Sequence, residues 1–313
     1  MRETALLVAT LLVATSCGGE PPGVRLYGNV HDYDPQGGIA LLKDGRVVEL
    51  GSTFPPTIVP FEPIRAISPL FQVVTAARGE LFSYRRRGSE FVRVDAPVPV
   101  TPIGGAVFRT PDGQVFTYND STTKVTFLHS FRNATACSTF GCLIGGDFKP
   151  YTETHIVPGP FSEISTAAVP DDSGVYAEGT VVLRPNGVVV TITSDSDDFF
   201  FPPDRKGKPT ILEIPELPAI AHLRDRFFED RDEHIWFRGV AATVPPILYL
   251  ETGELECTIR SRKYYPATCI GPTRVPAFDG TRPFVTEGGI VAITKLGELR
   301  CWVREGGACP MGE

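Results

Sequence analysis

The segment Glu229–Trp236, with the sequence EDRDEHIW, holds the densest group of side chains that could do chemistry. Neighbouring carboxylates can act as an acid and a base when burial separates their pKa values. The same part of the chain carries Arg224, Arg226 and Arg231, whose charges would neutralise these acids at the edge of a sheet. Because neutralisation accounts for the composition without catalysis, we interpret the segment as structural.

Other motifs of catalytic and metal-binding proteins are incomplete. Ser121 and Lys124 match S-x-x-K, but the residues after them have a strand pattern, so we interpret them as a turn. Asp195, Asp197 and Asp198 could bind calcium, although the glycine and closing glutamate of an EF-hand are missing. The five histidines form no metal-binding pair. The sequence predicts no catalytic residue, no cofactor and no metal site, with weak calcium binding left open.

Two short clusters could instead bind a partner. One is a basic run that could hold a phosphate or an acidic glycan, formed by Arg85, Arg86 and Arg87. The other is an aromatic run between acidic residues and prolines, with the composition of a protein interface, formed by Phe199, Phe200 and Phe201. The alternatives are an exposed hairpin end and a local core under a loop. The net charge of −7 disfavours nucleic acid as a ligand.

Six cysteines follow Cys17, and an even number favours disulfides in an exported chain. Six cysteines allow 15 pairings, but their order along the chain falls into three local pairs. We expect disulfides between Cys137 and Cys142, between Cys257 and Cys269, and between Cys301 and Cys309. Each would stabilise the fold by about 2–3 kcal/mol. Zinc is the alternative, but neither C-x-x-C spacing nor a histidine pair accompanies these cysteines.

Residues 1–17, MRETALLVATLLVATSC, are expected to be an export signal. The apolar run Ala5–Ala14 is too short to span a bilayer. The end of this stretch, VATSC, resembles the cleavage site of bacterial lipoproteins, which makes Cys17 the residue expected to carry a lipid. Residues 18–23 would form a flexible tether, and the absence of aspartate at Gly18 fits the outer membrane. A periplasmic or secreted protein is the alternative.

A repeated hairpin would position these groups. In Gly38–Gly51, GIALLKDGRVVELG, two apolar strands meet at Asp44-Gly45, a pair that predicts a two-residue type I′ turn. Apolar residues recur two positions after, and five and six positions before, the turn glycine in six copies, at Gly45, Gly79, Gly113, Gly187, Gly253 and Gly297. Chance hairpins would not agree at both distances, so the copies indicate a structural repeat.

The spacing of the copies predicts the kind of repeat. The first three glycines are 34 residues apart, and Gly146 falls near the middle of the next, longer gap. Between Gly187 and Gly253, Glu233 stands where the glycine would be, so one of two neighbouring hairpins is extra to the repeat. A period of roughly 35–45 residues made only of strands is typical of propeller blades.

Composition agrees with an all-β fold. The chain has 313 residues, with 31 glycines and 29 prolines, which favours turns and short strands over helices. We predict a single β-propeller over residues 24–313, with seven blades. The early strand Val24–Val30 would complete the last blade, which closes the ring and removes its free edge.

The hairpin pattern h-h-x-x-x-D-G-x-V-h-x-h resembles the repeats of the regulator of chromosome condensation family, which form a seven-bladed propeller. The segment EDRDEHIWF also resembles blades of bacterial sensor propellers, which keeps the subfamily open. The first resemblance implies a protein-binding propeller, since that family includes secreted inhibitors of β-lactamase.

We therefore expect a monomeric cell-envelope lipoprotein whose propeller binds a protein or an envelope ligand. An envelope enzyme that acts on polysaccharide or peptide in the central funnel is the alternative. A cluster of carboxylates or histidines at one ring face, with perturbed pKa values, would favour the enzyme. A purely structural lipoprotein is a third possibility, and it predicts no concentrated patch.

Overall fold

The computed structural model of the chain is almost entirely β-structure. It describes residues 23–35, 37–51, 55–68, 73–85, 88–119, 122–151, 155–170, 176–194, 209–214, 217–224, 227–237, 258–261, 265–268, 273–275, 278–286 and 289–303. Their helical structure is of the short 3-10 kind, as in η1 (His129–Phe131). None of the described helical structure is long and apolar enough to cross a membrane.

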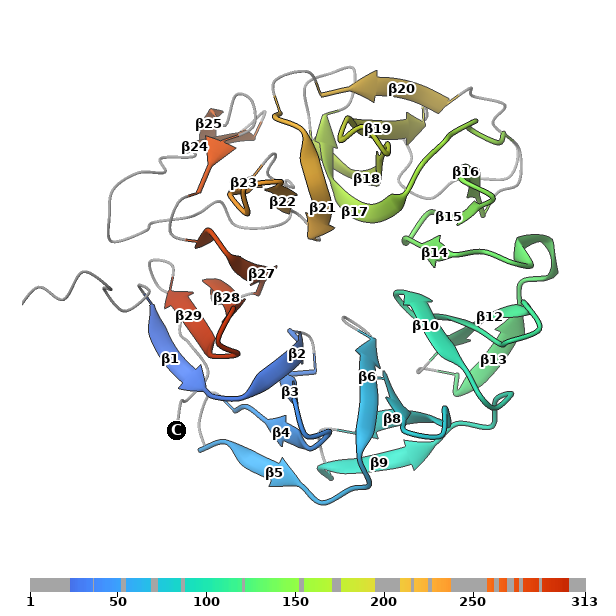
Figure 1. Ribbon diagram of the computed structural model, residues 1–313, viewed down its shortest axis with the longest axis vertical. Coiled ribbons are helices and arrows are strands. Elements are labelled where there is room, and N and C mark those ends of the chain that lie inside the picture. Colours follow the sequence, from blue (N-terminus) through green and yellow to red (C-terminus); the bar gives the residue numbers. More distant parts are fainter. Residues whose placement is uncertain are drawn as a thin grey trace, which may run out of the picture.

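Seven antiparallel sheets of the described strands stand around a common centre as the blades of a propeller (Figure 1). Blade 1 contains β2 (Val30–Asp34), β3 (Ile39–Leu42), β4 (Val47–Glu49) and β5 (Thr57–Val59). Blade 2 contains β6 (Ile64–Ser68), β7 (Val73–Ala76), β8 (Leu81–Arg85) and β9 (Glu90–Arg93). Blade 3 contains β10 (Thr101–Gly104), β11 (Val107–Arg109), β12 (Val115–Asn119) and β13 (Lys124–Phe127). Blade 4 has three strands, β14 (Ala136–Cys137), β15 (Gly141–Ile144) and β16 (Asp147–Pro150).

The chain then continues around the ring. Blade 5 contains β17 (Glu163–Pro170), β18 (Tyr176–Leu183), β19 (Val189–Ser194) and β20 (Pro209–Glu213). Blade 6 contains β21 (Ile220–Arg224), β22 (Phe227–Asp230), β23 (Ile235–Phe237) and β26 (Thr273–Arg274), and a separate hairpin of β24 (Thr258–Ser261) and β25 (Tyr265–Thr268) is inserted before its last strand. Blade 7 contains β27 (Thr281–Val285), β28 (Gly289–Thr294), β29 (Leu299–Val303) and β1 (Val24–Tyr27). The prediction of a seven-bladed, all-β propeller is confirmed.

The ring is closed by its first strand, as the sequence predicts. β1 pairs with β29, with Val24 opposite Cys301 and Tyr27 opposite Leu299, and so becomes the outermost strand of blade 7 (Figure 1). Leu26, which is fully buried, packs in the apolar layer between blades 7 and 1. The two ends of the described chain therefore share one sheet.

The predicted hairpin is present, but its turn is one residue longer than predicted. The carbonyl of Leu42 accepts the N–H of Gly45 at 3.0 Å, and the N–H of Leu42 donates to the carbonyl of Arg46 at 2.8 Å. This is a three-residue turn in which the last residue alone needs positive φ, here 87° at Gly45. The type I′ prediction is wrong because Asp44 does not take positive φ. Among the described turns, Gly145 and Gly146 have the two positive φ angles of a type I′ turn, 63° and 91°.

The same two hydrogen bonds define the turn in six blades, at residues 42–46, 76–80, 110–114, 184–188, 230–234 and 294–298. In blade 6 the position of the turn glycine belongs to Glu233, with φ of 63°, as the alignment of repeats predicts. The turn at Glu233 therefore belongs to the repeat, and the hairpin predicted around Gly253 falls in the insertion between β23 and β26, outside the described residues.

These turns also join each blade to the next. The carbonyl of the residue at the turn-glycine position accepts a backbone N–H from the beginning of the following blade, with N···O distances between 2.7 and 3.0 Å. The donors and acceptors are Ile64 to Gly45, Val100 to Gly79, Asn133 to Gly113, Phe161 to Gly146, Ile220 to Gly187, Gly280 to Glu233 and Val30 to Gly297. A bond of this kind crosses every junction of the ring.

Apolar layers between neighbouring blades form the core. On β3, Ile39 packs toward blade 2, whereas the next residue, Ala40, packs toward blade 7. Alternate residues of one strand thus face opposite neighbours, which explains why the repeat is apolar on both faces.

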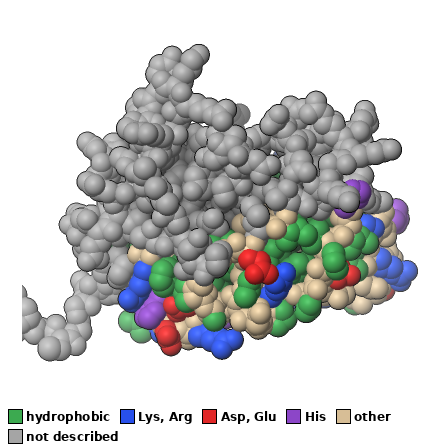
Figure 2. Space-filling view, turned by 90° about the horizontal axis from the view of Figure 1, so that it is seen from above, with side chains coloured by type: hydrophobic (Ala, Val, Ile, Leu, Met, Phe, Trp, Pro, Cys, Tyr) green, Lys and Arg blue, Asp and Glu red, His purple; other side chains and the backbone are tan. Residues whose placement is uncertain are grey.

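The two faces of the ring differ. We call the face with the turns between second and third strands the turn face, and the opposite one the loop face. The connections from blade to blade also lie at the turn face, because they bond to the turns. Connections between first and second, and between third and fourth, strands leave from the loop face. Figure 2 shows the ring from its edge, with acidic and basic side chains close together along the described band.

Candidate functional site

The centre of the ring is lined by the first strand of each blade (Figure 1). Each of these strands begins near the residue that donates to the preceding turn, so the residue two positions after that donor can be compared from blade to blade. Four consecutive blades carry a charged or titratable residue there, which we call the ring-centre charges: Glu163, His222, Arg282 and Asp32. The other three blades have Ala66, Pro102 and Thr135.

One pair of ring-centre charges joins blades 7 and 1. Arg282 Nη2 lies 2.5 Å from Asp32 Oδ1 and also donates to the carbonyl of His31 at 3.0 Å. Burial raises the pKa of Asp32, and this effect outweighs the opposing influence of Arg282, the N–H of Tyr33 and His31. Asp32 is therefore the ring-centre carboxyl that most resembles a catalytic acid.

The other pair joins blades 5 and 6. Glu163 Oε1 lies 2.8 Å from Nδ1 of His222, and Oε2 accepts the N–H of Leu223 at 2.8 Å. β21 has an irregular register between Ile220 and His222, and β2 has one between Val30 and Asp32. β6 has the same irregularity between Ile64 and Ala66, whereas the strands that carry Glu163 and Arg282 pair in a regular register, so the β-bulge belongs to the repeat and not to the charges.

Sequence reasoning missed the ring-centre charges. His31 and His222 were considered only for metal-binding spacing along the chain, and the acids were not considered. The first strands lack a turn glycine, so their alignment is weak, but counting from the beginning of each blade would have placed the four residues in one column. The described contacts arrange the four residues as two separate pairs, Glu163 with His222 and Arg282 with Asp32.

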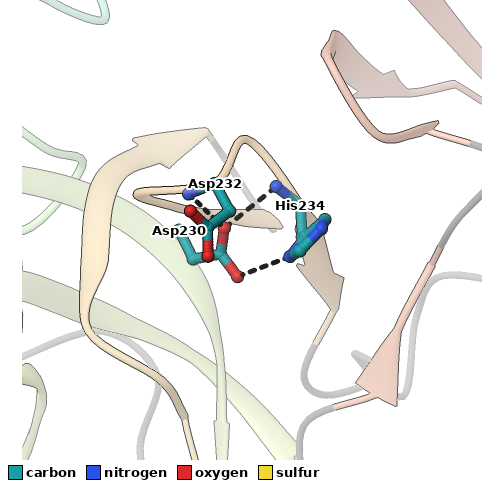
Figure 3. A group of neighbouring side chains, drawn as sticks. All are labelled: Asp230, Asp232 and His234. Carbon is teal, nitrogen blue, oxygen red and sulfur yellow. Dashed lines mark hydrogen bonds and ion pairs between the residues drawn. The ribbon is translucent and has the colours of Figure 1, made fainter.

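The segment Glu229–Trp236 forms the turn of blade 6 (Figure 3). Asp230 is buried, and its Oδ1 accepts the N–H groups of Asp232 and His234 at 2.9 and 3.0 Å. Its Oδ2 accepts the indole N–H of Trp236 at 2.9 Å and lies 3.2 Å from Nδ1 of His234. Burial would raise the pKa of Asp230, but the Trp236 and backbone N–H groups and the charge of His234 outweigh burial and lower it.

Asp230, Asp232 and His234 also bring ligand atoms within 4.8 Å of one another, close enough for a metal ion. Both oxygens of Asp230 already accept hydrogen bonds that hold the turn, so a metal would have to displace them. Nearby, Arg224 lies 2.7 Å from Glu229, and Lys295 pairs with Glu233. These contacts agree with the interpretation of the segment as structural.

The predicted disulfide between Cys137 and Cys142 is present, and it joins directly paired residues of β14 and β15 with a Cα–Cα distance of 4.0 Å. Cys301 is disulfide-bonded as well, with a partner outside the described residues. The two other predicted pairings stay predictions, because three of the cysteines lie outside the described residues: Cys257, Cys269 and Cys309.

Of the predicted partner-binding residues, Arg85 is exposed at the end of β8, on the loop face. The other predicted partner-binding residues lie outside the described residues: Arg86, Arg87, Phe199, Phe200 and Phe201. Cys17 and the acidic run Asp195–Asp198 lie outside them as well. Lys124 begins strand β13 rather than lying on a helix, which agrees with the interpretation of S-x-x-K as a turn.

Comparison with known proteins finds neither a matching family model nor a matching curated protein. A crystal structure of BBS1N in complex with ARL6DN is 12% identical, covers 91% of this chain and 95% of that chain, and has a TM-score of 0.44. A structure of PorZ, a bacterial surface component of the type-IX secretion system of Porphyromonas gingivalis, is 11% identical, covers 93% of this chain and 39% of that chain, and has a TM-score of 0.38. Likeness at this level says nothing of function, and the propeller is established by the strand pairing itself.

Proposed function

We propose that the chain is a cell-envelope lipoprotein whose propeller binds a protein or an envelope ligand through its loop face. The regulator of chromosome condensation-like repeat and the lipid on Cys17 are parts of this proposal. The protein would act as a rigid ring that presents loops, and it would need no cofactor.

The observation that carries the proposal is the placement of two long connections. Residues 195–208 join the third strand of blade 5 to the fourth, and Ser194 and Pro209 at their ends are paired. Residues 238–272 occupy the same position in blade 6, between the paired residues Phe237 and Thr273. Both connections therefore start and end at the loop face of neighbouring blades, and the first contains Phe199–Phe201.

A rigid scaffold supports this function physically. Backbone hydrogen bonds cross all seven junctions, and apolar layers fill the spaces between blades. Loops attached to a rigid frame lose less conformational freedom on binding than loops on a mobile one, which raises affinity.

The test is a pull-down from the source organism's envelope with tagged Gly18–Glu313 and a variant with Phe199→Ser, Phe200→Ser and Phe201→Ser. A matched control carries Ile58→Ser and Leu296→Ser, which remove exposed apolar side chains elsewhere, 42% and 78% exposed. We expect one stoichiometric partner that the control retains and the triple variant loses. A partner retained by all three proteins would show that the aromatic run does not bind it.

The lipid anchor is tested separately by labelling cells with an alkyne fatty acid. We expect label on the wild-type protein and none on Cys17→Ser, which should move to the soluble fraction. Label on both proteins, or on neither, would contradict anchoring through Cys17.

The ring-centre charges favour a second candidate, an envelope hydrolase with Asp32 as its acid. Its test is turnover of envelope polysaccharides and peptides by wild type and by Asp32→Asn. Turnover that disappears in a folded Asp32→Asn protein would establish the enzyme, and turnover equal in both would exclude Asp32 as its acid.

A further inference from the structure

Three cations surround η1 at the junction of blades 3 and 4, and each is held by a neutral backbone carbonyl. Lys149 Nζ donates to Ser130 at 3.0 Å, Arg132 Nη2 donates to Asp112 at 3.2 Å, and Arg109 Nη1 donates to Ala134 at 3.0 Å. The backbone thus orders these cations, and among the described residues no acid pairs with them.

The contacts of these three cations differ from those of the paired cations in blades 5 to 7, although Lys43 and Arg65 also donate to backbone carbonyls, those of Leu296 and Val100. No described carboxylate lies within 4.0 Å of Arg109, Arg132 or Lys149, whereas cations of blades 5 to 7 pair with acids. The acids nearest to these cations in the chain accept hydrogen bonds from other groups. Asp112 accepts hydrogen bonds from Thr110 and from Gln114, which lower its pKa, and Asp147 accepts the N–H of Gly159 at 2.8 Å.

Aromatic surface adjoins these cations. Phe127, at the end of β13, is 39% exposed, and its ring stacks on that of the exposed His129, with centroids 5.9 Å apart. Lys149 lies 5.1 Å from the ring centre of Phe131. Arginine and aromatic side chains are the residues that dominate binding energy in protein interfaces. We call Arg109, Phe127, His129, Arg132 and Lys149 together the η1 patch.

We propose that the η1 patch is a docking surface for a segment of a partner protein rich in Asp and Glu. A guanidinium held by one N–H to a carbonyl keeps further N–H groups for a carboxylate, and its planar shape suits two parallel bonds. Phe127 and His129 would cover an apolar side chain between the acids. This surface is separate from the loop-face site, because η1 belongs to a blade-to-blade connection beside the turn of blade 3.

A peptide partner fits better than a polyanion such as nucleic acid. Three cations in a protein of net charge −7 give a local attraction, while the overall field repels an extended polyanion. Exposed aromatic area between fixed cations suits alternating acidic and apolar side chains.

The experiment measures fluorescence anisotropy of a labelled peptide of glutamate and phenylalanine, with Gly18–Glu313 titrated against it at low and at high salt. The test variant carries Arg132→Glu and Lys149→Glu. The control carries Lys43→Glu and Arg46→Glu, an exposed Lys and Arg in the turn of blade 1 on the same side of the ring. Total charge is equal in the two variants, and thermal unfolding verifies that both are folded.

We expect the test variant to bind at least about tenfold more weakly than wild type and the control, because reversing two charges turns attraction into repulsion. Binding should also weaken with salt and with glutamine in place of glutamate in the peptide. Equal loss in both variants, or no binding by wild type, would overturn the proposal. The proposal would also be overturned if wild type bound anionic phospholipid vesicles but not the peptide, and the test variant lost the vesicle binding. The patch would then be a membrane contact.

Discussion

At the scale of single residues, buried carboxylates in this ring act first as acceptors that hold backbone and neighbouring blades in place. Asp230 shows this most fully, because both of its oxygens accept N–H groups of its own hairpin. A hydrogen bond to a charged group is worth more than one between neutral groups, and a buried donor left unpaired costs its full desolvation.

Changing Asp230→Asn should lower the free energy of unfolding by about 2–3 kcal/mol at neutral pH, because the amide nitrogen would face donors. The measurement is urea unfolding, with Asp232→Asn, an exposed neighbour, as the control. Because the folded pKa of Asp230 lies below its unfolded value, its contribution is present above about pH 4 and is lost as pH falls through the folded pKa. A gap between wild type and variant that grows in acid would contradict this account.

The opposite sign applies to Asp32, whose folded pKa is raised. Its contribution to the free energy of unfolding is present below the unfolded pKa and is lost as pH rises through the folded one. Among the groups that favour ionised Asp32, Arg282 has the largest effect. Arg282→Met should therefore cost about 1–2 kcal/mol at pH 7, after allowance for partial exposure. Asp32→Asn should cost less, and Arg282→Met combined with Asp32→Asn should recover part of the loss. The measurement is the free energy of unfolding of each variant. If the two single variants lose the same free energy, Arg282 does not act by neutralising a buried Asp32.

At the scale of elements, the three-residue turn is the unit that the fold repeats. Its last residue must take positive φ, and its carbonyl must meet the next blade. At Gly79 a side chain would also approach the backbone of Pro99, with a Cβ only 2.8 Å from its Cα, whereas at Gly145 nothing lies within 4 Å.

These surroundings predict different costs for one substitution. Gly79→Ala should destabilise by more than about 2 kcal/mol, since it combines unfavourable φ with a clash that shifts the blade junction. Gly145→Ala should cost about 1 kcal/mol, from φ alone. Conversely, Glu233→Gly should stabilise by about 0.5–1 kcal/mol, because an exposed ion pair with Lys295 is worth little. Thermal unfolding of the three variants checks the order, and equal effects of the two alanines would refute the role of the junction.

The same turn explains what sequence reasoning could and could not find. A required positive φ marks the chain with glycine, so the repeat and the degenerate position Glu233 were visible, whereas which of the two neighbouring hairpins is extra stayed open. The number of residues in the turn could not be read from the sequence, because Asp-Gly suits a two-residue turn as well as the last two positions of a three-residue turn. The ring-centre charges were missed because the first strands lack a turn glycine to align them, and which of these residues pair across a blade junction depends on the closed ring.

At the scale of the whole molecule, stability depends on the first strand. Leu26 lies in an apolar layer with residues of blade 7 and blade 1, including Val30, Val291 and Leu299. In blade 7, the buried residues Cys301 and Trp302 lie on β29, the strand that β1 covers. The ring is therefore closed at one seam, where β1 pairs with β29.

A chain that begins at Gly28 should lose this closure, whereas a chain that begins at Gly23 should unfold like one that begins at Gly18. Removing Leu26 alone costs about 3 kcal/mol, and the truncation also opens the backbone edge of β29, which invites pairing between molecules. Calorimetry should show a lower Tm for the chain from Gly28, and size-exclusion chromatography should show association. Leu26→Ala in the chain from Gly23 should reproduce the lower Tm without association, while Val24→Ala, at a side chain 58% exposed, should change little. If the chain from Gly28 keeps its Tm and stays monomeric, the seam does not hold the ring closed, and the seven junction bonds alone must do so.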